Sequence, residues 1–165
     1  MPTGEERECG GCTACCFTHS VARAGIPVTK MFEWCGHCTQ GVGCSIYENR
    51  PGSCRTYKCL WLLDSLDESM RPDRWGIVID IWEVPGEELK LANFWECVKG
   101  RFAAPDIQAM IQGLIATGRY AVAGRPMNRD QPLYFPAGMT DAEKLRFLQA
   151  AVQELIQQQD AAAAG

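Results

Sequence analysis

The sequence predicts an α+β protein, in which an irregular, cysteine-rich, metal-bound amino-terminal half joins a small antiparallel sheet with flanking helices. The chain has 165 residues, a length that suits one ordinary domain. Nine of its ten cysteines fall between Cys9 and Cys59, among glycine and turn residues. After that stretch, β-branched and aromatic segments are followed by segments of helical periodicity. We expect residues 1–60 to form a cysteine-cluster metal-binding module, residues 61–158 to form an α+β portion packed with it as one domain, and residues 159–165 to form a frayed tail.

The first regular elements are expected directly after the cysteines. Apolar residues recur at helical spacing over residues 60–70, which predicts a helix that Arg71-Pro72 ends. The acidic residues of this segment would lie on its exposed face: Asp64, Asp67 and Glu68. The segments 77–84 and 89–95 flank Pro85-Gly86 and predict a β-hairpin.

Two helices and a third strand complete the expected α+β portion. From Asp106, apolar residues recur on one helical face until Gly118 ends the helix. Residues 120–123 predict a strand, followed by a loop that contains Gly124, Pro126, Asn128 and Pro132. Thr140 and Glu143 form a capping box at the start of a last amphipathic helix.

Composition excludes two classes of partner. The chain carries 20 acidic and 16 basic residues, a net charge of −4, which argues against binding nucleic acid by phosphate neutralisation. No stretch approaches the ~18 to 20 consecutive apolar residues of a membrane span. The amino terminus has neither the basic nor the apolar region of a secretory signal. We therefore expect a cytoplasmic protein with no nucleic-acid and no membrane partner.

In a reducing compartment, closely spaced cysteines serve as metal ligands more readily than as disulfides. The turns Cys9-x-x-Cys12 and Cys35-x-x-Cys38 are separated by 22 residues, close to the spacing of a tetrahedral zinc site. The run Cys9, Cys12 and Cys15 instead matches the first three ligands of a ferredoxin-type iron–sulfur cluster. Since nine cysteines exceed the four that one ion needs, we expect two sites, or one cluster with several metals.

Other residues near the cysteines are interpreted as structural. Cys97 stands apart, beyond the predicted hairpin, and is expected to be a small buried residue rather than a ligand. His19 and His37 lie in the cysteine-rich half, but a lone histidine is more often hydrogen-bonded or exposed, so neither is placed among the ligands. No catalytic residue can be assigned, because the chain has no Ser-His-Asp order, phosphate-binding loop or dinucleotide fingerprint.

The cysteine-rich half resembles the YkgJ-like cysteine-cluster family, which is described as zinc- or iron-chelating. The resemblance covers roughly residues 9–60 and depends on the C-x-x-C-x-x-C-C run at 9–16, the Cys-Ser-Ile-Tyr-Glu string at 44–48 and the Arg-Pro-x-x-Cys-Arg string at 50–55. It implies these ligands: Cys9, Cys12, Cys15, Cys16, Cys38, Cys44 and Cys54. Cys59 follows where the motif often carries one more cysteine and completes our predicted set, whereas Cys35 matches no motif position.

The motif also gives a role to residues between the cysteines. Pro51 would stiffen the approach to Cys54, Arg50 or Arg55 would offset thiolate charge, and Tyr47 would pack on the site or donate its hydroxyl to it. A related domain occurs in flagellin lysine methylases, where an iron–sulfur cluster is implied. No methyl-donor motif is visible in this chain, so that activity does not carry over.

Three functional hypotheses follow. The leading one is a metal-binding protein whose cysteines hold an iron–sulfur cluster or zinc, with iron slightly favoured because surplus thiols and the ferredoxin-like triple suit a cluster. The second is a structural zinc module that supports a protein-interaction domain, and therefore has a protein partner. The third is a redox or modifying enzyme that uses the cluster, with no substrate indicated by the sequence.

Overall fold

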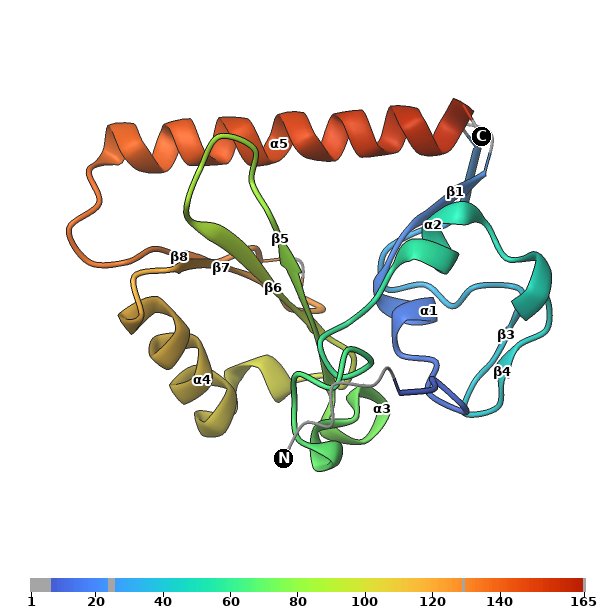
Figure 1. The fold of residues 1–165 in the computed structure, drawn as a ribbon. Helices are drawn as coiled ribbons and strands as arrows, with labels where there is room; N and C mark the ends of the chain where they lie inside the picture. Colours follow the sequence, from blue (N-terminus) through green and yellow to red (C-terminus); the bar gives the residue numbers. More distant parts are fainter. Residues whose placement is uncertain (1–6, 24–25, 129, 165) are drawn as a thin grey trace.

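The computed structural model describes residues 7–23, 26–128 and 130–164 (Figure 1). The predicted α+β class is confirmed, with helices on a four-stranded sheet and the cysteine-rich region beside it. Residues 1–6, which hold most of the amino terminus predicted to be non-secretory, lie outside the described residues, as does Gly165 of the predicted tail. Within the described ranges, no helix combines the length and the apolar character that crossing a membrane requires.

The sheet consists of β5 (Ile77–Trp82), β6 (Lys90–Glu96), β7 (Tyr120–Arg125) and β8 (Leu133–Tyr134), in this order. β5 and β6 form the predicted antiparallel hairpin, and β8, a strand that was not predicted, follows Pro132 and pairs antiparallel with β7. β6 and β7 are parallel, so the expectation of a three-stranded, wholly antiparallel sheet is wrong at this pair. The reason is α4 (Pro105–Ala116), which returns the chain across the sheet before β7 begins.

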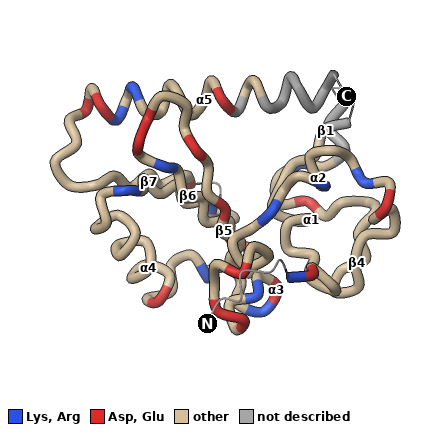
Figure 2. Tube along the Cα trace, viewed as in Figure 1, with Lys and Arg blue, Asp and Glu red and all other residues tan. Residues whose placement is uncertain are grey.

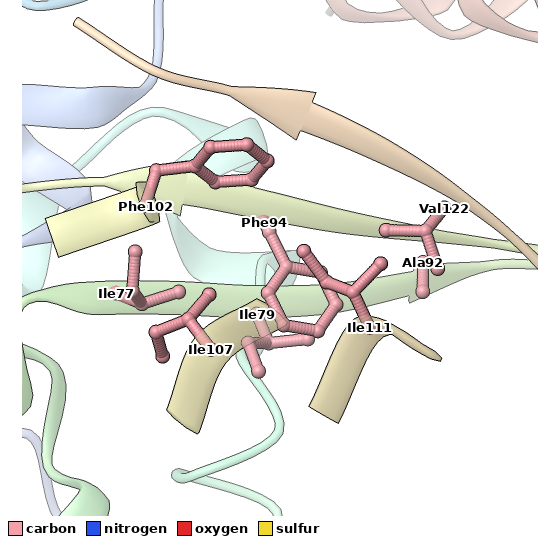
Figure 3. Close-up of a cluster of buried hydrophobic side chains, with 8 residues drawn as sticks. All are labelled: Ile77, Ile79, Ala92, Phe94, Phe102, Ile107, Ile111 and Val122. Atoms are coloured by element: carbon pink, nitrogen blue, oxygen red, sulfur yellow. The ribbon is translucent and has the colours of Figure 1, made fainter. Parts of the chain in front are cut away.

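One face of the sheet packs against α4. Because side chains alternate along a strand, Ile77 and Ile79 of β5 and Phe94 of β6 point to the same side. Figure 3 shows the resulting buried cluster: Ile77, Ile79, Ala92, Phe94, Phe102, Ile107, Ile111 and Val122. The short helix η3 (Arg101–Ala103) contributes Phe102, which closes the cluster.

The opposite face is shared between α5 (Asp141–Ala164) and the cysteine module. The predicted capping box begins α5: the Thr140 amide donates to Glu143 Oε2 (2.7 Å), and the Glu143 amide donates to Thr140 Oγ1 (3.3 Å). Phe147 of α5 is fully buried against Leu91, Ala121 and other residues of one end of this face. The helix continues to Ala164, through all but the last residue of the predicted tail.

The single helix predicted over residues 60–70 is wrong. This segment consists of turns that lead to η2 (Glu68–Met70) and α3 (Pro72–Trp75). Asp64 has φ +54°, which interrupts helical backbone, and the Ser65 amide donates to Leu60 O instead (2.9 Å). Asp64 is also not exposed as predicted: it is buried and forms an ion pair with Arg7.

The cysteine module contains only short elements, as its irregular sequence predicts. They are α1 (Cys15–Thr18), β1 (Val21–Arg23), β2 (Ile26–Thr29), β3 (Cys38–Thr39), β4 (Gly43–Cys44), η1 (Tyr47–Asn49) and α2 (Gly52–Thr56). In Figure 1 the module lies to the right of the sheet, beside β5. Helices of four or five residues are not stable by themselves, so these must be held by tertiary contacts.

We predict that Phe147→Ala lowers the free energy of unfolding by about 3–5 kcal/mol, because it removes the buried side chain that joins α5 to the sheet. The matched control is Val152→Ala on the same helix, which should change it by less than about 0.5 kcal/mol because Val152 is 52% exposed. Urea unfolding measures both. Equal losses would contradict the packing described for α5.

Candidate metal centre

The cysteine module and β5 border a cavity of about 1130 Å³. Cysteines contribute a large part of its lining: Cys9, Cys12, Cys15, Cys16, Cys35, Cys44 and Cys54. Six of these seven belong to the predicted ligand set, and Cys35 is the additional one. Cys38 and Cys59, the other two predicted ligands, are not among the lining residues of the described chain. All ten cysteines lie within the described ranges and are free thiols.

Backbone hydrogen bonds bring the cysteines together. The Cys12 amide donates to Cys9 O and the Cys38 amide donates to Cys35 O, each at 2.9 Å, so both C-x-x-C segments form closed turns. The Cys35 amide donates to Cys16 O (3.1 Å), which places the second turn beside α1. In the β3–β4 hairpin, Cys38 pairs with Cys44.

A glycine allows the first turn to approach the β3–β4 hairpin. A Cβ atom at Gly11 would lie 2.6 Å from Gly41 O, a distance at which the backbones would have to separate. Beside this contact the Gly41 amide donates to Thr13 Oγ1 (3.2 Å), and Thr13 is buried. The two loops that carry Cys9, Cys12 and Cys38 are therefore closely packed.

The thiols around the cavity interact with one another. Burial raises the pKa of Cys38 to about 12, and the neighbouring Cys16 adds to this rise. The pKa of Cys16 is raised by a hydrogen bond with Cys15, then by burial. Burial also raises the pKa of Cys54, with further contributions from Cys16 and other thiols. These cysteines thus share one electrostatic environment, in which uncompensated thiolates would repel one another.

The cysteines around the cavity do not form a complete set of metal ligands. Within the described part of the chain, no group of three or more His, Cys, Asp or Glu side chains is placed so that it could hold a metal ion. The structure therefore gathers the predicted cysteines around a common space but does not arrange their sulfur atoms as ligands of one ion.

Two hydrogen-bond donors at the cavity lack partners. Arg50 Nε and Ser53 Oγ are buried, and neither forms a hydrogen bond with any described residue. Both residues line the cavity. The positive charge of Arg50 lowers the pKa of Cys9 and of Cys54, and so partly offsets the rise that burial causes. The Arg50 guanidinium lies 3.6 Å from the centroid of the Tyr47 ring, a cation–π contact. This placement agrees with the predicted role of Arg50 in offsetting thiolate charge.

Sequence reasoning missed Asp80, a buried carboxylate on β5 that lines the same cavity. Its Oδ2 accepts hydrogen bonds from Trp95 Nε1 (2.7 Å) and Tyr57 Oη (3.0 Å) and lies 3.3 Å from His19 Nε2. Its Oδ1 accepts from Asn93 Nδ2 (2.9 Å). The available signal was one acidic residue within an apolar strand, since a buried charge needs partners.

The aromatic partners of Asp80 fix the position of His19. The His19 ring centroid lies 4.4 Å from that of Tyr57 and 4.4 Å from that of Trp95. His19 Nδ1 lies 2.7 Å from Thr18 Oγ1, so both ring nitrogens have polar neighbours within the protein. Both His19 and the exposed His37 line the cavity, so leaving them out of the ligand set stays a prediction. Burial and the Asp80 charge raise the pKa of Tyr57, which keeps its hydroxyl a donor.

Cys97 is partly buried, as predicted. It packs against the buried cluster of Ala14, Val78 and Trp95. Its Sγ donates to Pro72 O at 3.5 Å.

Comparison of the chain with protein-family models, with curated proteins and with solved structures found no match. The resemblance to the YkgJ-like family therefore stays a prediction.

We predict that Asp80→Ala lowers the free energy of unfolding by at least about 3 kcal/mol, because it leaves several buried donors without an acceptor. Asp80→Asn should cost less, since its amide can pair with Asn93 Oδ1, which is buried and has no hydrogen-bond partner among the described residues. The matched control is Glu83→Ala, an exposed acidic residue paired with Lys90, expected to cost at most about 1 kcal/mol. Urea unfolding followed by tryptophan fluorescence measures all three, and similar losses for Asp80→Ala and Glu83→Ala would refute this role.

Proposed function

We propose that this protein binds metal through its amino-terminal cysteines, and that the metal is iron in an iron–sulfur cluster rather than zinc. The observation that carries the proposal is that seven cysteines line one cavity together with two unpaired, buried hydrogen-bond donors, Arg50 Nε and Ser53 Oγ. The proposed ligands are Cys9, Cys12, Cys15, Cys16, Cys38, Cys44, Cys54 and Cys59.

The electrostatics of the thiols support a bound cation. Burial and mutual proximity raise the pKa of Cys38 and of Cys54, so these thiols are protonated at neutral pH while no cation is bound. A metal ion reverses this balance, because it replaces the protons and compensates the charge of the thiolates. The positive charge of Arg50, which opposes the rise in the pKa of Cys16 and of Cys54, offsets what negative charge remains.

The unpaired donors favour a cluster over a single ion. Thiolate and inorganic sulfide both accept hydrogen bonds, and such bonds tune iron–sulfur clusters. Arg50 Nε and Ser53 Oγ would find these acceptors in a loaded cavity, which explains why they are buried without partners. The cavity also presents more thiols than the four that a zinc ion takes. An iron–sulfur cluster would supply electron-transfer chemistry.

The setting we infer is the reducing cytoplasm, since free thiols in this number persist only where disulfides do not form. We propose that nucleic acid and membranes are not partners. Acidic and basic residues are interspersed over the described chain rather than forming a continuous basic stripe (Figure 2), which supports this proposal.

A structural zinc module is the second candidate. It is favoured by the two closed C-x-x-C turns, at Cys9–Cys12 and Cys35–Cys38, because this turn recurs in zinc sites. In that case the metal would stabilise the module, and the α+β portion would be the part available to a protein partner.

Anaerobic purification from a cytosolic expression host, followed by visible spectroscopy and metal analysis, tests the proposal. We expect a brown protein with iron and acid-labile sulfide, and a loss of most of its iron in Cys12→Ser and Cys54→Ser, together with lower stability. Ser45→Ala, at an exposed position beside Cys44, is the matched control and should retain its iron. A colourless protein with stoichiometric zinc would contradict the cluster, and a protein that binds neither metal would contradict the whole proposal.

Arg50→Ala should increase the loss of metal to a competing chelator by about 10- to 100-fold, because it removes a donor and a positive charge beside the thiols. Arg50→Lys keeps the charge without the Nε donor and should show an intermediate loss. Arg119→Ala, at an exposed arginine that does not line the cavity, is the control and should behave as the unaltered protein. Unchanged metal retention in Arg50→Ala would remove the proposed role of Arg50.

A further inference from the structure

We infer that a pocket between the end of β7 and the segment that follows β2 binds a small organic acid, and that Arg125 and Lys30 hold the carboxylate of this ligand. The pocket has a volume of about 250 Å³. It is separate from the cavity of cysteines, because none of its lining residues lines that cavity. The inference is therefore independent of the proposed metal binding.

Both halves of the molecule contribute lining residues to the pocket. One group directly follows β2 of the cysteine module: Lys30, Met31 and Phe32. The other group begins at the sheet with Arg125, the last residue of β7, and continues into the loop after it. The pocket therefore exists only when the module is docked on the sheet.

Arg125 is a half-buried cation with few partners in the protein. Its Nη1 donates to Gln131 Oε1 (2.8 Å), and its guanidinium lies 5.6 Å from the centroid of the Trp95 ring. Among the described residues, no carboxylate forms an ion pair with it. Since a guanidinium has five N–H donors, most of this group is left for a ligand in the pocket that it lines.

The protein compensates the charge of Arg125 only in part. Burial lowers the pKa of Arg125, and the negative charge of Asp80 opposes this without cancelling it. The Asp80 carboxylate already accepts hydrogen bonds from Trp95, Tyr57 and Asn93. An anion in the pocket would supply the opposite charge that a buried cation needs.

Two further residues can donate hydrogen bonds to the same ligand. Because Gln131 Oε1 accepts from Arg125, the remaining polar group of the Gln131 side chain is its NH₂, a donor. Lys30 Nζ lies 4.0 Å from Glu33 Oε1, and both side chains are largely exposed. An exposed pair of this kind is weak and does not fix the Lys30 ammonium.

The other lining residues indicate the class of anion. Met31, Phe32 and Pro126 are apolar, which suits a hydrocarbon group. Asp130 is also in the described lining, and its charge would repel a dianion such as phosphate more strongly than a monoanion. The volume lies below the ~300 to 1,000 Å³ of pockets for drug-sized ligands. A monocarboxylate with a small apolar group therefore fits best.

The turn that carries Lys30 is strained and is fixed by packing. Phe32 has φ +62°, a left-handed value that residues other than glycine rarely adopt. The Glu33 amide closes the turn by donating to Lys30 O (3.2 Å). Phe32 packs against the buried cluster that contains Trp95, the same ring that Arg125 lies over. Strain of this kind persists where surrounding contacts impose it, and it is common at ligand sites.

The test is an NMR titration of the full-length protein as purified, with phenylacetate and with its neutral analogue phenylacetamide. We expect phenylacetate to bind at least about 10-fold more tightly, because hydrogen bonds between two charged groups are stronger than those to a neutral amide. Inorganic phosphate should not displace it at equal concentration. Equal affinities for phenylacetate and phenylacetamide, or displacement by phosphate, would overturn the inference.

Arg125→Gln should weaken phenylacetate binding by about 10- to 100-fold, because it removes the charge and the paired donors of the guanidinium. Lys30→Gln, at an exposed position, should weaken it by about 2- to 5-fold. The matched control is Arg119→Gln, the same change at an exposed arginine that does not line the pocket, which should bind as the unaltered protein does. Unaltered binding in Arg125→Gln would overturn the inference.

A measurement without variants guards against misfolding of Arg125→Gln. Phenylacetate, but not phenylacetamide, should slow the modification of Arg125 by the arginine reagent phenylglyoxal, as followed by mass spectrometry. The modification of the exposed Arg119 should proceed at the same rate with either compound. Modification of Arg125 at one rate with and without phenylacetate would also overturn the site.

Discussion

The hydrogen bonds to the Asp80 carboxylate hold the cysteine module on the sheet. Two of the surrounding groups come from β6, Asn93 and Trp95, and two come from the module, His19 and Tyr57. His19 directly follows α1 and Tyr57 directly follows α2, so one carboxylate fixes the ends of both short helices that carry cysteines. Helices this short need such external contacts. A buried charge is costly without partners. Separation of the module from β5 would therefore expose the Asp80 carboxylate and its neighbours to water or leave them buried without hydrogen-bond partners.

The alternation of side chains along β5 determines where the module can bind. Ile77 and Ile79 point to α4, whereas Val78 and Asp80 point to the opposite face. The parallel pairing of β6 and β7 places α4 on the first face, and α5 covers only the end of the second face around Ala121. The remaining part of that face carries Asp80 and Asn93, two buried polar residues of the sheet, so its contact with the module combines packing at Val78 with hydrogen bonding at Asp80.

Features encoded by local pattern were predicted from the sequence: the β5–β6 hairpin, α4 and the capping box of Thr140. Features that depend on distant partners were not. The periodicity of residues 60–70 predicted a helix, but Asp64 takes a positive φ and pairs with Arg7, which lies far away in the sequence. The parallel register of β7 depends on β6 in the same way. At the site, six of the eight predicted ligands line one cavity, and their role as ligands stays a prediction, whereas the role of Asp80 follows from donors that only folding brings together.

The two halves of the molecule have different sources of stability. The sheet is enclosed by apolar side chains of α4 and α5, with Phe94 and Phe147 fully buried on its opposite faces. The module has strands of two to four residues and, where its burial is described, few large buried side chains, so its form depends on close loop contacts such as Gly11 against Gly41 and on its thiols. In the proposed metal-bound protein, ligand bonds would supply the cohesion that an apolar core supplies elsewhere. The Asp80 hydrogen bonds lie at the boundary between the halves and join Tyr57 of the module to Trp95 of the sheet through one carboxylate.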